Sequence, residues 1–222
     1  MKMPRYVLSL IILSALTWGC ADTTSHSRAV YMLMDTSGTY SQQLDQAKTI
    51  INKLLISLQS GESLAVARID SGSFSEKDIV AKVTFDQRPS VANQQKLKFK
   101  ESIDMFIGGV RGSAHTDIKG AILQAVDYLD ETQAAHKYIM IFSDLEEDLA
   151  DGHIRNLDRI TLDLTGYRVV ALNVTKLGLD QVDPKRYYDR LDAWARIVKD
   201  RGGIWIKLND IARLDRLLKP ET

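Results

Sequence analysis

The sequence predicts an α/β fold of the doubly wound kind: a mainly parallel sheet with one antiparallel edge strand and helices on both faces. Two observations carry this prediction. Short apolar segments of strand length alternate with longer segments whose apolar residues recur at helical spacing. That alternation is typical of parallel sheets covered by helices. The apolar segments 63–69 and 78–85 follow each other so closely that the second is expected to form an antiparallel hairpin edge.

Composition places the chain among folded globular proteins. It has 222 residues, of which 45% are hydrophobic and 26% are charged. These values are ordinary for a folded domain, and the length suits one large domain. The 29 basic and 29 acidic residues cancel. The chain therefore lacks the excess of basic residues that is typical of nucleic-acid-binding proteins, and we expect no nucleic-acid partner.

Residues 1–19 have the pattern of a secretory leader. Lys2 and Arg5 come first, and an uncharged, largely apolar run extends from residue 6 to residue 19. This run is too short for a membrane-spanning helix and has the length of a cleavable signal segment. We therefore expect residues 1–19 to direct export and to take no part in the folded domain.

Cys20, the only cysteine of the chain, directly follows this leader. A cysteine at that place resembles the bacterial lipoprotein signal, which implies lipidation at Cys20 and a membrane anchor. The expected location is the cell envelope, facing the periplasm. The outer membrane is favoured because Ala21, rather than aspartate, comes next. The alternative is ordinary cleavage after Ala21, which would give a soluble periplasmic protein.

The elements of the folded part can be predicted in order. Residues 20–28 are small and polar and are expected to form a tether, so that the domain covers 29–219. The continuous apolar run 29–35 suits a strand buried on both faces, and 41–59 has the apolar spacing of a helix. The remaining predicted strands are 63–69, 78–85, 136–144, 168–174 and 203–208. The remaining predicted helices are 90–110, a helix that begins just after Thr116 and ends at residue 131, 153–165, 185–202 and 210–219.

Polar side chains with oxygen atoms follow two of the predicted strands. The first apolar run ends in Asp35, and Ser37 and Thr39 alternate after it in "DTSGT". Asp144 ends the apolar strand "HKYIMIFSD", and Thr116 stands in the loop before the preceding helix. Ligand sites of doubly wound sheets lie at the carboxyl ends of the strands, beside the point where strand order switches. We therefore expect three distant segments to bring oxygen atoms to one edge of the sheet.

The motifs "DTSGT", "HTDI" and "FSD", in this order, resemble the von Willebrand factor type A domain, a Rossmann-like fold, and its metal-ion-dependent adhesion site. The resemblance covers roughly residues 28–218. It implies that Ser37, Thr39 and Thr116 are direct ligands of a divalent ion and that Asp35 and Asp144 bind it directly or through water. Thr39 replaces the usual serine and keeps the hydroxyl. "SAHT" replaces a common glycine pair, which affects ligand preference more than metal binding.

The mixture of ligands also suits the expected ion. Mg²⁺, or Mn²⁺ in its place, prefers oxygen ligands in octahedral geometry. Two carboxylates among three hydroxyls leave such an ion poorly neutralised, so that it attracts a further carboxylate from outside. The resemblance thus implies a protein partner that presents Glu or Asp to the ion, in an adhesion or scaffold module. The alternative is a structural scaffold of the envelope that makes no functional use of the metal.

Each of these motifs also has a simpler interpretation. An aspartate followed by hydroxyl residues is common in turns and helix caps, and Thr116 could be the N-cap of the next helix. The acidic loop 145–153 is expected to be solvated, with a lesser chance that it shapes the partner site. His115 is expected to pack in its loop rather than to bind metal. The order of the motifs and their places at strand ends favour the metal site.

Known enzyme motifs are missing or incomplete. "MDTSGT" resembles the first motif of haloacid dehalogenase-type phosphatases, in which a second aspartate serves as general acid. Ser37 stands at that second position, so the acid is absent. The sequence contains no G-x-S-x-G, Walker or H-E-x-x-H motif. We therefore expect a binding protein without enzymatic activity.

Overall fold

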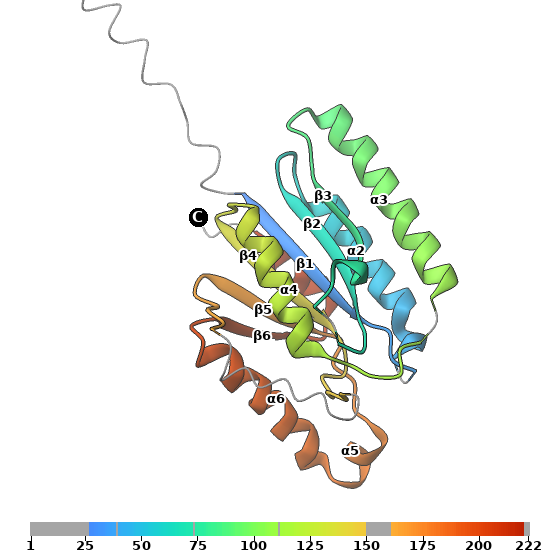
Figure 1. Ribbon diagram of the computed structural model, residues 1–222, viewed down its shortest axis with the longest axis vertical. Helices are drawn as coiled ribbons and strands as arrows, with labels where there is room; N and C mark the ends of the chain where they lie inside the picture. Colours follow the sequence, from blue (N-terminus) through green and yellow to red (C-terminus); the bar gives the residue numbers. More distant parts are fainter. Residues whose placement is uncertain (1–26, 39, 73, 111, 150–160, 220–222) are drawn as a thin grey trace, which may run out of the picture.

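The computed structural model describes residues 27–219 except 39, 73, 111 and 150–160, so the predicted leader and most of the tether lie outside the described residues. The described chain forms one six-stranded sheet with the order β3-β2-β1-β4-β5-β6 (Figure 1). All neighbours pair in parallel except β2 and β3, which are antiparallel. The predicted mainly parallel sheet with one antiparallel edge strand is therefore confirmed.

The strands and helices alternate along the chain as predicted. The strands are β1 (Arg28–Asp35), β2 (Ser63–Ile69), β3 (Ile79–Thr84), β4 (His136–Phe142), β5 (Tyr167–Leu172) and β6 (Ile204–Leu208). The helices are α2 (Leu44–Ser57), α3 (Pro89–Gly109), α4 (Ile118–Glu131), α5 (Gly178–Val182), α6 (Pro184–Lys199) and α7 (Leu214–Leu217). None of the described helices is long and apolar enough to cross a membrane.

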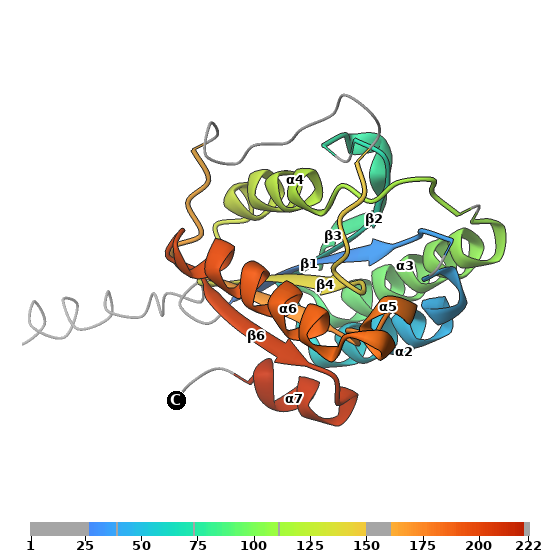
Figure 2. The ribbon, with the colours of Figure 1, turned by 90° about the horizontal axis from the view of Figure 1, so that it is seen from below.

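Helices cover both faces of the sheet, as the sequence predicts. Figure 2 shows α4 on one side of the sheet and α2 and α7 on the other. Buried residues of α4 and α6 form one core with the sheet, and those of α2, α3 and α7 form the second. The central strand β1 is buried along its whole length, which explains why residues 29–34 are all apolar.

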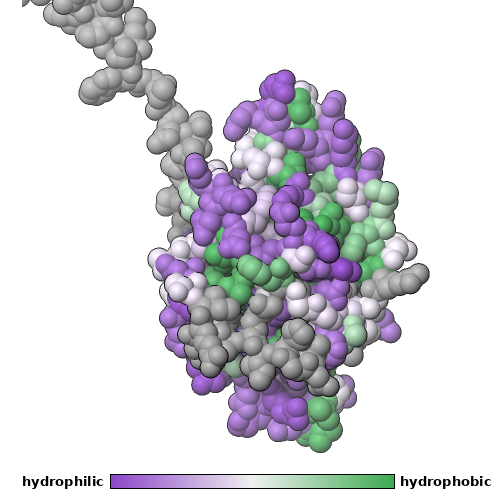
Figure 3. Space-filling model, viewed as in Figure 1, coloured by the Kyte–Doolittle hydropathy of each residue, from purple (hydrophilic) through white to green (hydrophobic). Residues whose placement is uncertain are grey.

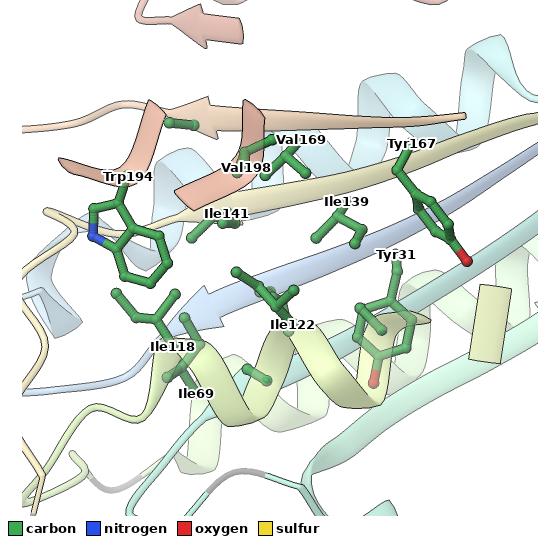
Figure 4. Close-up of a cluster of buried hydrophobic side chains, with 14 of the residues drawn as sticks. Tyr31, Ile69, Ile118, Ile122, Ile139, Ile141, Tyr167, Val169, Trp194 and Val198 are labelled. Atoms are coloured by element: carbon green, nitrogen blue, oxygen red, sulfur yellow. The ribbon is translucent and has the colours of Figure 1, made fainter. Parts of the chain in front are cut away.

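Alternate residues of each strand enter opposite cores. Figure 4 shows Tyr31 and Ile139 in the same core as Ile122 of α4. Trp194 and Val198 of α6 enter the same core. Their neighbours along the strands, such as Met32 and Met140, point to the other face. The period of two that defines a strand thus supplies both layers of helices with apolar partners.

Several predicted boundaries are wrong. Most of the helix predicted at 153–165 lies outside the described residues, but 161–164 are not helical and 165–166 form a turn. The short helix α5 was not predicted. The last predicted helix, 210–219, consists of a 3₁₀ turn at Ile211–Arg213 followed by the single turn of α7. The first strand begins at Arg28, one residue before its predicted start.

Arg28, the first residue of β1, joins three parts of the fold. Its side chain is buried and forms a salt bridge of 2.6 Å with the buried Glu62, which directly precedes β2. The same guanidinium donates to the carbonyl oxygens of Leu218, after α7, at 2.6 Å and of Ser57, at the end of α2, at 2.8 Å. The entry of the chain into the sheet is therefore bonded directly to its C-terminal helix.

Candidate metal-binding site

Two buried carboxylates lie at the carboxyl ends of neighbouring strands. β1 and β4 pair in parallel with Met34 opposite Phe142, so the segments that follow the two strands run side by side. Asp35 and Asp144 are 1% and 3% exposed. Strand β1 is also the switch point, because the chain passes to β2 on one side through α2 and reaches β4 on the other through α4. The predicted place of the site is thus the place where such sheets bind ligands.

Backbone hydrogen bonds bring the loop before α4 against the loop after β1. The amide of Ser113 donates to the carbonyl of Thr36 at 2.8 Å, and Ser37 and Ser113 form an isolated parallel bridge. Within the first loop, the amide of Ser37 donates to Oδ1 of Asp35 at 2.8 Å. Ser37 is half-buried at this junction. Thr39, the third residue expected from this loop, lies outside the described residues.

A second bridge joins Thr116 to the loop after Asp144. The amide of Thr116 donates to the carbonyl of Asp148 at 2.7 Å, and the amide of Asp148 donates back to Thr116 at 3.1 Å. The structure therefore brings together three of the distant segments in the way that the sequence predicts. The described site residues Asp35, Ser37, Thr116 and Asp144 all belong to these adjoining segments.

The simpler interpretation of Thr116, as the N-cap of α4, is wrong. The cap is Asp117, whose side chain accepts from the amide of Gly120 at 2.8 Å. The Thr116 side chain is buried, and its hydroxyl forms no hydrogen bond with any residue that the structure describes. Among the described residues only Asp104 Oδ1 is both fully buried and without a hydrogen-bond partner, so the Thr116 hydroxyl reaches the surface and is available to a ligand.

The environment of Asp144 disfavours its charged form. Burial raises the pKa of Asp144 to about 6; the nearby charge of Asp35 adds to this effect, while the amide of Glu146 and the charge of Arg190 oppose it. Oδ1 of Asp144 accepts from the Glu146 amide at 2.9 Å. Oδ2 has no hydrogen-bond partner within the described chain. Two buried carboxylates therefore share a region where a cation would be stabilising.

A sharp backbone turn positions the loop that carries Asp144. Leu145 is in the left-handed region with φ of 65°, which is strained for a branched side chain. Its carbonyl accepts from the indole nitrogen of Trp194 at 3.0 Å. Arg190 donates to the carbonyl of Asp144 at 2.9 Å. Two residues of α6 thus hold the turn in place.

The residues present fit a divalent ion that prefers oxygen ligands. Asp35 and Asp144 would supply two negative charges, and the hydroxyls of Ser37 and Thr116 would supply neutral oxygen atoms. Neither carboxylate forms an ion pair with a side chain that the structure describes. Among the described residues, no three His, Cys, Asp or Glu side chains are grouped to hold a metal. Any ion held here would therefore depend on hydroxyl oxygens as well as on the two carboxylates, and oxygen ligands are those that Mg²⁺ prefers in proteins.

Ser143 supports the site, although the sequence analysis did not single it out. Its hydroxyl donates to Oδ2 of Asp35 at 2.8 Å across the β1–β4 pair and accepts from the amide of Leu145 at 2.9 Å. Ser143 is completely buried. It thus orients one carboxylate and the turn that carries the other. The available signal was its place in "FSD", directly before Asp144.

We expect Ser143→Ala to lower the affinity for Mg²⁺ by about 10- to 100-fold, the range found for groups that orient metal ligands. The hydroxyl contributes no charge, so the loss arises because Asp35 is less well positioned. Calorimetric titration of Mg²⁺ measures this effect. Ser102→Ala is the matched control, since the hydroxyl of Ser102 only bonds to its own helix α3. Equal affinities of wild type and Ser143→Ala would show that Ser143 does not position a ligand.

The acidic loop after Asp144 is largely neutralised by basic residues. Glu146 pairs with Arg190 at 3.2 Å, and Glu147 pairs with Lys119 of α4. Asp148 lies 3.2 Å from a ring nitrogen of His115, which agrees with the loop-packing role expected for that histidine. The described part of this loop is therefore tied to the domain and does not form the free acidic surface expected from the sequence. Asp151 lies outside the described residues.

Comparisons with known proteins add evidence on the fold. No protein-family model and no curated protein sequence matches the chain. Among solved structures, a von Willebrand factor type A protein from Catenulispora acidiphila matches with a TM-score of 0.55 and 17% identity, over 87% of this chain and 41% of that one. The pilus adhesin SpaC from Lactobacillus rhamnosus GG, in an open conformation, matches with a TM-score of 0.54 and 10% identity, over 86% of this chain and 29% of that one.

A third solved structure, the manganese-loaded TRAP protein of Plasmodium vivax, matches with a TM-score of 0.48 and 12% identity over 89% of this chain and 74% of that one. At that score the likeness carries no weight for the site. This chain spans less than half the length of the two higher-scoring structures. At such low identities the likeness establishes the fold alone.

Proposed function

We propose that this chain, which has the von Willebrand factor type A fold, is a protein-binding module that holds a partner's Glu or Asp through a divalent ion, Mg²⁺ or Mn²⁺. The observation that carries the proposal is the meeting of three distant segments around two buried carboxylates. Oδ2 of Asp144 and the hydroxyl of Thr116 are both without a hydrogen-bond partner in the described chain. An ion coordinated by both side chains would give each of these atoms a partner.

The residues of the site fall into two groups, carboxylates and hydroxyls. Asp35 and Asp144 hold the negative charge, and Ser37, Thr39 and Thr116 offer neutral hydroxyl oxygens. Bound there, the ion would supply a positive centre that is incompletely neutralised and open to an external carboxylate. In the alternative, a scaffold that never uses an ion, no cation would compensate the negative charge of the two buried carboxylates.

Apolar side chains beside the site suggest how a partner would gain further contact. Leu179 and Val182 of α5 are 59% and 84% exposed, and Tyr188 at the start of α6 is 56% exposed. Figure 3 shows apolar surface at the lower tip of the molecule, where α5 lies. Arg190 connects α5 to the loop after β4. Its guanidinium donates to the carboxylate of Asp180 at 2.7 Å and to the carbonyl oxygen of Asp144. We infer that the partner's carboxylate is accompanied by apolar residues that pack on α5.

The cellular setting remains part of the proposal. The leader and Cys20 support a lipid anchor in the bacterial cell envelope, with the domain facing the periplasm. β1 begins at Arg28 and ends at Asp35, so the chain enters the central strand at the end opposite the candidate site. An anchored domain would thus present the site away from its point of attachment.

The proposal is tested by crosslinked pull-down from the cell envelope, with and without EDTA. We expect one partner to be lost both in EDTA and with Asp35→Asn, because each removes the ion. Asp192→Asn, an exposed change on α6, is the control and should retain the partner. Val182→Asp should weaken partner capture while leaving Mg²⁺ binding intact. A partner that remains bound in EDTA and with Asp35→Asn would support the scaffold alternative instead.

A further inference from the structure

A basic cavity lies at the end of the sheet that is remote from the candidate metal site. Its volume is about 290 Å³. It is formed where α7 packs against the face of β6 and its neighbours, on the side that Figure 2 shows below the sheet. The lining residues are His136, Tyr138, Arg168, Ile204, Ile206, Arg216, Leu217 and Lys219.

Strand register explains why these residues meet. Tyr138 of β4 stands opposite Arg168 of β5, and Arg168 stands opposite Ile204 of β6. Side chains at paired positions of neighbouring strands share a face, and so do residues two apart, which adds His136 and Ile206. The hydroxyl of Tyr138 donates to the carbonyl of Leu217 at 3.4 Å and joins α7 to this face. The cavity is thus a product of the sheet and its C-terminal helix.

The charge of the lining has one sign. Four of its side chains are basic, or can become so, and none is acidic. Within the described chain, neither Arg216, Lys219 nor His136 forms an ion pair. The Arg168 guanidinium lies over the ring of Tyr138, 5.7 Å from its centre. Five other arginines of the described chain pair with carboxylates, namely Arg28, Arg68, Arg88, Arg190 and Arg213. The basic groups of the cavity, Arg216, Lys219 and His136, differ in this respect, so the cavity is suited to an anion.

Apolar side chains border the basic groups. Ile204 is 51% exposed, and Ile206 and Leu217 are partly buried around the same space. An anion that carries apolar groups would satisfy both parts of the lining, whereas a free inorganic ion would use only the basic part. A lipid headgroup meets this requirement, since its phosphate is joined to acyl chains.

The cavity also lies beside the point where the described chain enters the sheet. His136 is paired with Arg28 at the start of β1, and its amide donates to the carbonyl of Ser27 at 3.0 Å. A membrane that held the chain through Cys20 would therefore meet this end of the sheet first. We propose that the cavity binds the phosphate group of an anionic phospholipid and so orients the domain on the membrane surface. This inference rests on the lipid anchor proposed above and on the cavity, and it is independent of the metal site.

Vesicle sedimentation tests the proposal with a chain that begins at residue 20 and carries Cys20→Ser, so that no lipid is attached. The described residues of both cores lie between 29 and 218, so this chain keeps them all. We expect it to bind vesicles of phosphatidylcholine mixed with phosphatidylglycerol and not phosphatidylcholine alone. A basic residue near an anionic surface contributes about fivefold in affinity, so Arg216→Gln with Lys219→Gln should reduce binding about 25-fold.

The control removes the same charge elsewhere. Lys98→Gln with Lys176→Gln changes two exposed lysines, on α3 and in the loop after β5, that lack an ion pair among the described residues. Both double variants should keep the melting temperature of the parent chain, because all four side chains are exposed. Equal loss of vesicle binding in the two variants would overturn the proposal, since net charge would then explain it.

A soluble ligand distinguishes the source of the phosphate. Glycerol phosphate, the headgroup without acyl chains, should compete only weakly with vesicles, because it lacks the apolar part. Tight binding of glycerol phosphate together with no binding to anionic vesicles would overturn the lipid assignment and indicate a soluble phosphate ligand. Failure to bind either probe would show that the cavity has no role in anion binding.

Discussion

Asp144→Asn is expected to raise the stability of the metal-free domain by about 3 kcal/mol above pH 7 and to abolish its stabilisation by Mg²⁺. Burial raises the pKa of Asp144 from 3.8 to about 6, so its charge destabilises the folded state when no cation is present. A difference of this size corresponds to about 3 kcal/mol. Asparagine removes the charge, and its carbonyl oxygen can still accept from the amide of Glu146.

The pH dependence follows from the direction of the shift. The folded domain binds a proton at Asp144 more tightly than the unfolded chain does, so the wild type loses stability as pH rises from about 4 through about 6. The advantage of Asp144→Asn should therefore vanish below about pH 4 and be complete above about pH 7. Urea unfolding in EDTA across this range measures it. A difference that does not change with pH would contradict this account of the site.

Added Mg²⁺ should reverse the order of the two proteins. An ion that binds only the folded wild type stabilises it by about 4.1 kcal/mol at a thousand times its Kd, by mass action, which exceeds the advantage of about 3 kcal/mol that the metal-free variant has. The variant lacks one of the two carboxylates and should gain little. Asp192→Asn serves as control, because it removes an exposed charge of α6 and should respond to Mg²⁺ as the wild type does. An unchanged wild type at millimolar Mg²⁺ would count against an ion at this site.

Removal of Arg28 is expected to destabilise the domain by about 3–5 kcal/mol, the usual cost of leaving a buried charge without its partner. In Arg28→Met, the carboxylate of Glu62 would stay buried beside β2, and the carbonyls of Ser57 and Leu218 would lose a donor. The double change Arg28→Met with Glu62→Met should recover much of this loss, because a buried ion pair can be replaced by apolar residues of similar volume.

Denaturant unfolding of the wild type, the two single variants and the double variant measures the coupling between Arg28 and Glu62. Lys185 and Asp189 offer a control, since they form an exposed pair on α6 whose removal should leave the free energy of unfolding nearly unchanged. If Arg28→Met unfolds like the wild type, the buried pair contributes no net stability and the C-terminal helix does not depend on it.

The long elements of the fold could be predicted because their apolar residues recur over many positions. The run 29–35 and the helical pattern of 118–131 each identify a buried element and its type. Helix α5 has five residues, too few to show a period, and it was missed. The helix predicted at 210–219 is longer than the observed α7 for a related reason. Apolar residues continue to Leu218, after the regular helix ends.

The candidate site could be predicted in outline, because strand ends and motif order are visible in the sequence. Its supporting contacts could not, since they depend on which strands become neighbours. Ser143 orients Asp35 across 108 positions of sequence. Thr116 and Asp117 are both good caps, and only the structure shows that Asp117 caps α4. The ion pairs of Glu146 and Glu147 involve residues from α6 and α4 that no local pattern reveals.

The central position of β1 has a mechanical consequence. The chain enters this strand from the tether at Arg28, and the loop that carries Ser37 leaves it at the opposite end. A pulling force between an anchored tether and a partner held at that loop would act along the strand. Seven residue pairs join β1 to β2 and seven join it to β4, all in parallel register. The load would fall on both ladders of hydrogen bonds in shear, so that they must slide together instead of opening one by one.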